Sequence, residues 1–469
     1  MENIHLILPE IILFLGICLA LMVGVFLKNS FSIVIKLSIF ILLGVIFLIL
    51  TDWGGEQKIF LDSFINDKFS DYFKILILAS SIFIFFSSEQ FIKDKKLSKF
   101  EYPIIIMFSI LGMFFMLSAN DLILFYLGLE LQSLALYVLA AIDRDNTTSS
   151  EAGIKYFVLS ALSSGLLLYG CSLLYGFTGS TNFEDISRSL NTQNVGAIFA
   201  MVFILVGLAF KVSAVPFHMW TPDVYQGAPT SITNFFAVVP KAVGLGVIIR
   251  FMDLPFKNII EEWQTIIIFI SIASMILGSV AAIGQKNIKR LLAYSSISHM
   301  GYALAGVATG SISGYTSTII YITIYIVMNM GTFACLYLMK AEGNYMEKIE
   351  DLSGLSKDKP MIAFSFLILF FSLAGIPPLG GFFAKFFIFM SVIESELYAL
   401  AIIGLLTTVI SAFYYLKVIK IIYFDNNKIK FDDVRNMSVK ATILISCLIL
   451  SLYFISPSLI SSLLDGLFT

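Results

Sequence analysis

Long apolar stretches, separated by short polar ones, run along almost the whole chain. A helix needs about 20 mainly apolar residues to cross the hydrocarbon core of a bilayer. About fourteen such stretches begin near residues 4, 33, 71, 102, 120, 152, 194, 230, 263, 287, 314, 361, 397 and 441. The pattern predicts an all-α polytopic membrane protein with a single membrane domain, residues 1–469, and no sizeable soluble part.

The composition supports this fold class. The 469 residues are 58% hydrophobic, 14% aromatic and 13% charged, whereas about 25% of the residues in soluble domains are charged. The first stretch contains Pro9 and Glu10 and has neither a basic start nor a small-residue cleavage site. We therefore expect a retained helix there rather than a signal peptide.

The distribution of basic residues predicts the orientation, because cytoplasmic loops are enriched in Lys and Arg. Of the 30 basic residues, 20 lie in or beside the loops that follow odd-numbered helices, and 6 lie in or beside the opposite loops. With fourteen helices, both termini lie on one side of the membrane. We expect a bacterial inner membrane with both termini periplasmic; a protist mitochondrial membrane is the alternative.

Five charged residues lie inside apolar stretches: Glu130, Lys155, Lys211, Lys241 and Lys385. A charge near the bilayer centre costs at least about 2.5–3.5 kcal/mol unless it faces protein or water, and such residues commonly mark ion pathways. The pattern therefore predicts a protein that moves protons or other cations. Snorkelling to the membrane surface is the alternative for Lys155, which lies one to two turns from the start of its helix.

Glu130 is far from both ends of its helix, and Lys155 on the next helix can approach its depth. We therefore predict a carboxylate–ammonium pair between these two residues. The alternative is a static ion pair that only fixes the packing of the fifth and sixth helices.

Two stretches contain breaks close to the lysines. Pro216 follows Lys211 in the seventh stretch, and Pro377 and Pro378 precede Lys385 in the twelfth. Proline removes a backbone donor and clashes with the preceding turn, and paired breaks indicate internal repeats around an ion site. The spacing predicts two inverted five-helix repeats, helices 4–8 and 9–13, with helices 7 and 12 broken. The expected parts are residues 1–99 (three N-terminal helices), 100–252 and 263–424 (the two repeats) and 441–469 (the C-terminal helix).

Other kinds of site are not indicated. The net charge of −2 does not favour nucleic-acid binding, and we interpret the short basic loop clusters as topology signals that face lipid headgroups. The four cysteines are scattered singly, without the spacing that iron–sulfur clusters need. The sequence contains no glycine-rich phosphate motif. We expect no cofactor and no metal in this chain, so that any redox chemistry lies in partner chains.

Three runs of residues resemble the antiporter-like membrane subunits of respiratory complex I, the NADH:quinone oxidoreductase. They are Gly207–Thr230, Asn287–Tyr302 and Gly375–Lys385, and the resemblance extends over about residues 100 to 420. Within that family the details resemble subunit N. Tyr225-Gln226-Gly227 differs from the sequence of the other members, Lys385 stands where subunit M usually has a glutamate, and the long lateral helix of subunit L is not seen.

The resemblance implies a proton-translocating subunit that couples quinone reduction in partner subunits to proton pumping. The family's functional positions match Glu130, Lys155, Lys211, Lys241 and Lys385, with His218 and His299 as relay or water-line residues. In that pattern the first two form a charged pair, the third is the central protonatable lysine, the fourth is its relay and the fifth is the terminal lysine. A packing role is the alternative for each histidine.

The resemblance also implies partners. They are the other membrane subunits of complex I, antiporter-like neighbours among them, together with subunits that bind NAD, FMN, iron–sulfur clusters and quinone; the enzyme activity belongs to that complex. The main alternative is a subunit of a multisubunit sodium/proton antiporter. A structural membrane scaffold is disfavoured by the five intramembrane charges and the two broken helices.

Overall fold

The computed structural model describes residues 4–190, 194–426, 429–434, 436–464 and 466–468, so parts of the predicted C-terminal segment, at 465 and 469, lie outside it. The chain forms two compact units. The first comprises residues 1–211, 239–263 and 466–469, and the second comprises residues 212–238 and 264–465. The ranges predicted for the two repeats, and their inverted relation, stay a prediction.

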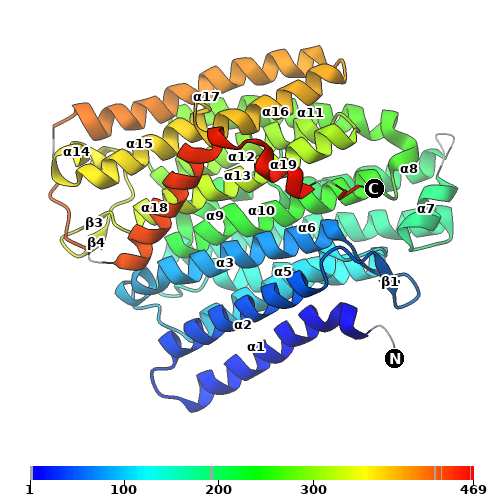
Figure 1. The fold of residues 1–469 in the computed structure, drawn as a ribbon, viewed down its shortest axis with the longest axis horizontal. Helices are drawn as coiled ribbons and strands as arrows, with labels where there is room; N and C mark the ends of the chain where they lie inside the picture. The colour runs from blue at the N-terminus through cyan, green and yellow to red at the C-terminus, as the bar shows by residue number, and fades with distance from the viewer. Residues whose placement is uncertain (1–3, 191–193, 427–428, 435, 465, 469) are drawn as a thin grey trace. The chain divides into compact units, whose positions relative to one another are not determined.

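The first unit is built from helices and one short hairpin. In chain order they are η1 (Ile4–Ile7), α1 (Leu8–Phe26), α2 (Phe31–Thr51), β1 (Gln57–Ile59), β2 (Phe64–Asn66), α3 (Lys68–Asp94), α4 (Glu101–Leu117), α5 (Leu122–Ala140), α6 (Thr147–Thr178), α7 (Phe183–Ser189), α8 (Val195–Lys211), the second part of α10 (Thr230–Asp253) and η2 (Lys257–Ile259). Helix α1 packs against α2 as an antiparallel hairpin, α2 packs against α3, α4 against α5, and α6 against α8 (Figure 1).

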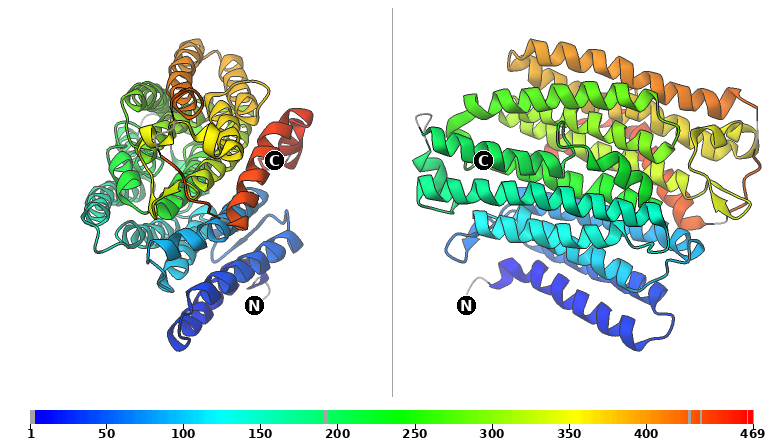
Figure 2. Two further views of the ribbon diagram at one scale, coloured as in Figure 1. Left: turned by 90° about the vertical axis from the view of Figure 1, so that its left-hand side faces the viewer. Right: turned by 180° about the vertical axis from the view of Figure 1, so that it is seen from behind.

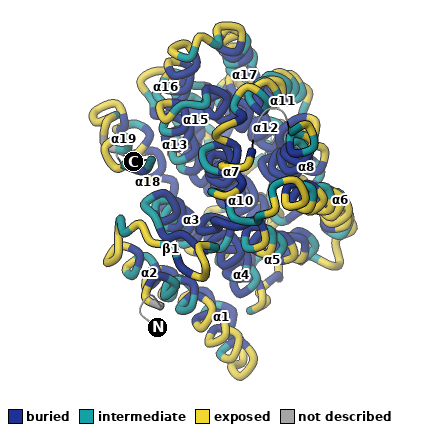
Figure 3. Tube along the Cα trace, turned by 90° about the vertical axis from the view of Figure 1, so that its right-hand side faces the viewer, coloured by how far each residue is buried: buried dark blue, intermediate teal, exposed yellow. Residues whose placement is uncertain are grey.

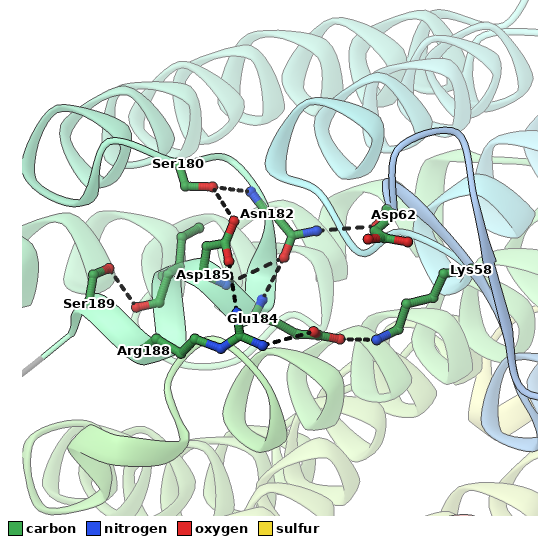
Figure 4. Close-up of polar contacts among 9 residues, drawn as sticks. Lys58, Asp62, Ser180, Asn182, Glu184, Asp185, Arg188 and Ser189 are labelled. Atoms are coloured by element: carbon green, nitrogen blue, oxygen red, sulfur yellow. Dashed lines mark hydrogen bonds and ion pairs between the residues drawn. The ribbon is translucent and has the colours of Figure 1, made fainter.

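Polar contacts connect the hairpin of β1 and β2 to the short helix α7 and its N-cap (Figure 4). The Asn182 side chain accepts from the backbone N–H groups of Glu184 and Asp185, which caps α7, and it donates to the Asp62 carbonyl at 3.2 Å. Lys58 forms an ion pair with Glu184. These contacts fix the loop that leads into α3.

Asp67 caps the start of α3 and pairs with Arg250 of α10. Its carboxylate accepts from the Ser70 N–H in a capping box. The Arg250 guanidinium donates to both of its oxygens at 2.9 Å. Burial alone raises the pKa of the Asp67 carboxyl, but the charge and hydrogen bonds of Arg250, with those of Ser70, outweigh it and lower the pKa below its ordinary value.

The second unit is also helical. Its elements are α9 (Trp220–Gly227), the first part of α10, most of α11 (Ile260–Ile283), α12 (Ile288–Val307), α13 (Ile312–Leu336), β3 (Lys340–Ala341), β4 (Asn344–Tyr345), η3 (Ile349–Leu352), α14 (Leu355–Asp358), α15 (Pro360–Ala374), α16 (Gly380–Glu394), α17 (Tyr398–Phe424), α18 (Met437–Leu452), η4 (Tyr453–Ile455) and α19 (Ser458–Leu464). Helix α13 packs against α12, α15, α16 and α18. Figure 2 shows α17, in orange, running along α15 and α16.

Each of the fourteen predicted stretches contains a helix, which confirms the polytopic all-α fold. Within the described ranges, ten helices are long and apolar enough to span a membrane, and α4, α8 and α15 are shorter apolar helices. Helix α10 is fully buried, whereas α1 and α6 each present exposed apolar residues along one side, drawn yellow in Figure 3. Exposed Leu, Ile and Phe side chains on such helices are typical of surfaces that face lipid or another membrane protein.

Both predicted helix breaks are present. Helix α8 ends at Lys211, and regular helix resumes only at Trp220 in α9. Helix α15 ends at Ala374, where Gly375 adopts a positive φ of 86°, and α16 begins at Gly380. The prolines predicted to interrupt helices 7 and 12 lie in these two gaps, because proline cannot continue the hydrogen-bonded ladder.

Candidate functional site

Lys211 is the last residue of α8, and its side chain is held among three helices of the first unit. The residue is only 6% exposed. Its Nζ donates to Ser133 Oγ at 2.6 Å and to Ser160 Oγ at 3.0 Å, from α5 and α6. The described hydrogen-bond partners of this ammonium are therefore neutral hydroxyls.

Polar groups continue from Lys211 along α5. The Tyr137 hydroxyl donates to Ser160 Oγ at 2.6 Å. Glu130 lies one turn before Ser133, and its charge acts on Lys211 and Tyr137. The Oε1 atom of Glu130 is buried and has no hydrogen-bond partner among the described residues. Hydrogen bonds and electrostatic interactions thus connect a carboxylate, a phenol, two hydroxyls and an ammonium in this cluster.

Lys155 and Lys241 differ sharply in their surroundings. Lys155 forms an ion pair at 2.7 Å with Glu151, one turn earlier on α6, and 42% of its side chain is exposed. The structure thus supplies an ion pair that the sequence did not predict, while the pair with Glu130 stays a prediction. Lys241 is fully buried in α10.

Lys385 lies beside the second break, in the helix that follows it. It is buried in α16, and its Nζ donates to the carbonyls of Leu373 at 3.2 Å and Ala374 at 3.0 Å. The same Nζ lies 4.9 Å from the centre of the Tyr302 ring. The ammonium therefore meets the negative end of α15, where unsatisfied carbonyls favour a cation.

Gly375 leaves room for the Lys385 side chain. A Cβ atom on Gly375 would lie 3.0 Å from Lys385 Cδ and 3.3 Å from Nζ, and the φ of 86° disfavours any L side chain. We expect Gly375→Ala to destabilise the protein by about 1–2 kcal/mol through the backbone alone, and to displace the Lys385 ammonium. Thermal unfolding of the purified protein measures the first effect. The control is Gly343→Ala, which is also at positive φ but has no atom within 4 Å of the added Cβ, so it measures the backbone cost alone. Equal losses of stability in the two variants would contradict crowding of Lys385.

His299 lies in a chain of phenols and hydroxyls in the second unit. Its Nδ1 is 2.6 Å from the Tyr321 hydroxyl, and its Nε2 is 3.2 Å from the Tyr415 hydroxyl. Tyr415 in turn hydrogen-bonds Ser295. An imidazole between two phenols can accept a proton on one side and donate one on the other, so the geometry suits a relay.

His218 lies in the gap between α8 and α9 and is partly exposed. Its Nδ1 has no hydrogen-bond partner among the residues that the structure describes. Its role as a relay stays a prediction.

Sequence reasoning missed part of the polar interior. Lys74, which lies close to the start of α3 and was not among the predicted charged residues, is 0% exposed and pairs with Glu10 at 2.8 Å. Tyr321 and Tyr415 were also missed, because nothing in the spacing of 20 tyrosines distinguishes those that reach His299. Within the described ranges, no group of three or more His, Cys, Asp or Glu residues could hold a metal ion.

The chain is similar to membrane subunits of NADH:quinone oxidoreductases and of Mrp antiporters. The family model for the transmembrane region of NADH:quinone oxidoreductase and Mrp antiporters matches residues 119–411. The NADH-quinone oxidoreductase subunit N of Pelagibacter ubique is 56% identical over 459 residues, 98% of either chain. The subunit N 1 of Rhizobium meliloti is 50% identical over 435 residues, which is 92% of this chain and 90% of that protein.

Solved structures give the same fold. A chain of respiratory complex I from Thermus thermophilus with bound aureothin superposes with a TM-score of 0.83 at 28% identity, covering 96% of this chain and 98% of that one. A chain of the Mrp complex from Dietzia sp. has a TM-score of 0.87 at 19% identity, over 98% of this chain and 96% of that one. The second likeness is one of fold alone.

Proposed function

The chain belongs to the family of NADH-quinone oxidoreductase subunit N, an antiporter-like membrane subunit of respiratory complex I, and on this premise we propose that it translocates protons through lysines and a glutamate of its helices. The proposed carriers are Glu130, Lys155, Lys211, Lys241 and Lys385, with His218 and His299 as relays. Quinone reduction in partner subunits supplies the driving energy.

The observation that carries this proposal is the environment of Lys211. Its ammonium is buried and is held by the hydroxyls of Ser133 and Ser160 rather than by a carboxylate. A lysine fixed by a strong ion pair would keep its proton, because separating buried opposite charges is costly. Neutral hydroxyls can bond the nitrogen in either protonation state, since each can donate and accept. Lys211 is thus arranged to hold a proton and to release it.

Glu130 supplies a means of control. A unit charge that approaches or leaves at about 5 Å changes the energy by about 3 kcal/mol at an effective dielectric constant of about 20. Moving one proton against about 150 mV requires about 3.5 kcal/mol. The two energies are comparable, so a shift of Glu130, or of Lys155 as its proposed counter-ion, is sufficient to switch Lys211 between the two states.

The second unit offers its own carrier and relay. Lys385 is held by the neutral carbonyls of Leu373 and Ala374. His299 connects Tyr321 with Tyr415 by hydrogen bonds. We assign proton holding to Lys385 and proton passage to His299.

Electron transfer is assigned to partner subunits. In this proposal NAD, FMN, iron–sulfur clusters and quinone bind to other subunits of the complex. The chain's partners within the membrane are the other membrane subunits, including antiporter-like neighbours. The proposed location is the bacterial inner membrane with both termini periplasmic, because most basic residues follow odd-numbered helices.

The hydroxyls that hold Lys211 give a direct test. In the double variant Ser133→Ala, Ser160→Ala the ammonium loses both described partners, and each hydrogen bond to a charged group contributes about 1.5–3 kcal/mol. We expect proton uptake driven by NADH in inside-out membrane vesicles to fall at least about tenfold, since 1.4 kcal/mol corresponds to a factor of ten.

The matched control is Ser81→Ala, Ser87→Ala on α3. Among the described residues, these buried serines donate to carbonyls of their own helix, Ile77 for the first and Phe83 and Ile84 for the second. The control is expected to pump normally. Normal pumping in the Ser133, Ser160 variant would count against the role of Lys211, and ion transport that requires sodium would favour the antiporter alternative.

A further inference from the structure

A second cluster of buried charges lies in the first unit, away from Lys211, where α1 and α3 meet. Glu10 in the first turn of α1 is 2% exposed, Asp71 in the first turn of α3 is 3% exposed, and Lys74 one turn later is fully buried. Lys74 Nζ lies 2.8 Å from Glu10 Oε1. Asp71 interacts electrostatically with both and accepts a backbone hydrogen bond from Gly54.

Three polar atoms of this cluster have no hydrogen-bond partner among the described residues. Neither oxygen of Glu10 nor the Nζ of Lys74 makes a hydrogen bond of acceptable geometry to any described residue, even though the two groups are in ion-pair contact. The other walls near Lys74 are aromatic, with ring centres of Phe64 and Phe114 at 5.4 and 5.5 Å. Buried polar atoms are normally hydrogen-bonded, so these groups are able to bond a small polar molecule such as water.

The charges of the cluster do not balance. Two carboxyls face one ammonium, which leaves one negative charge in excess if all three groups are ionised. The surrounding elements do not correct this. Asp52 ends α2, Arg250 of α10 is already paired with Asp67, and the described ionisable residues of α4 lie in its first turn, distant from Phe114. His5 of η1 lines the adjoining cavity, and the Asp67 carboxylate also acts on Asp71.

A cavity borders the cluster at Asp71. It has a volume of about 250 Å³ and is lined by Asp71 together with His5, Pro9, Asp52 and Asn66, among others. Its walls come from the start of α1, the end of α2 and the segment that enters α3. The volume is ample for several waters, and the polar lining gives them partners.

We propose that Glu10, Asp71 and Lys74 form a proton-binding site in which the two carboxyls share one proton and exchange it with water in this cavity. Proton transfer from a hydronium ion forms one O–H bond on a carboxyl oxygen and leaves a water molecule. The shared proton removes the excess negative charge, which is costly to keep in a buried site. The site lies outside the proposed lysine path and does not depend on it.

Infrared difference spectroscopy of the assembled complex, titrated with alkali, tests the proposal. The carbonyl stretch of a protonated carboxylic acid is distinct from that of a carboxylate. We expect an acid band in the wild-type complex at neutral pH that disappears on alkaline titration. In Glu10→Gln, and separately in Asp71→Asn, one carboxyl is left to pair with Lys74, and the acid population at neutral pH is expected to fall at least about tenfold.

Asp52→Asn is the matched control, because Asp52 lines the same cavity but is exposed. It is expected to keep the band. If neither buried-carboxyl variant lowers the acid band relative to wild type, the cluster is a static ion pair and the proposal is wrong. If a variant fails to assemble, the wild-type complex is treated with a hydrophobic carbodiimide and examined by mass spectrometry. This reagent adds only to protonated carboxyls. An adduct on Glu10 or Asp71 that declines with rising pH supports the site, and no adduct at neutral pH overturns it.

Discussion

Replacing Lys211 with methionine is expected to reduce NADH-driven proton uptake in inside-out vesicles at least about tenfold. Methionine is similar in length and apolar, so it fills the space without providing a protonatable nitrogen. Ser133 and Ser160 then lose their shared partner. Quinone reduction slows as well if the two processes are tightly coupled.

Lys211→Arg separates charge from proton transfer. Arginine keeps a positive charge and can donate to both serines, but it does not deprotonate in proteins. If Lys211 only stabilises the packing of α5, α6 and α8, the arginine variant is expected to pump. If Lys211 carries protons, that variant is expected to be as inactive as Lys211→Met. Lys28→Met, at an exposed turn after α1, controls for loss of a lysine as such.

Lys385→Met is expected to have a comparable effect on pumping and a larger effect on stability. The carbonyls of Leu373 and Ala374 lose their donor at the end of α15. Leaving a buried acceptor unsatisfied costs about 1–3 kcal/mol. We expect a lower unfolding temperature in addition to proton uptake reduced at least about tenfold.

The arginine variant again distinguishes two roles. Lys385→Arg can still donate to both carbonyls, so stability is expected to recover while pumping does not. The control is Lys417→Met, because Lys417 also donates to a backbone carbonyl, that of Ile283 at 3.4 Å, but is exposed. A Lys385→Met variant that is unstable yet pumps at the wild-type rate per assembled complex would limit Lys385 to capping α15.

The fold could be predicted from the sequence because membrane helices carry their signal in uninterrupted apolar length. The two breaks were equally readable, since Pro216, Pro377 and Pro378 act through local backbone chemistry. The division into two compact units, with boundaries at Lys211 and Trp263, could not be predicted from the sequence. It depends on how helices pack, which local sequence does not encode.

The lysine sites were only partly predictable. Apolar surroundings marked Lys211, Lys241 and Lys385, and the structure buries all three. The same reasoning did not single out Lys74, which is close to the start of α3, and it did not reveal that Glu10 approaches it from α1. Membrane helices are apolar on every side, so their sequence gives little indication of which face meets a neighbouring helix.

The most direct test is the ratio of protons taken up to quinone reduced, measured side by side in inside-out vesicles for wild type and Lys211→Arg after assembly of the complex has been verified. Our account predicts that proton uptake in the variant is lost, with quinone reduction either slowed or uncoupled from it. A wild-type ratio and rate in Lys211→Arg would contradict it, because a side chain that keeps its proton cannot carry one across the membrane.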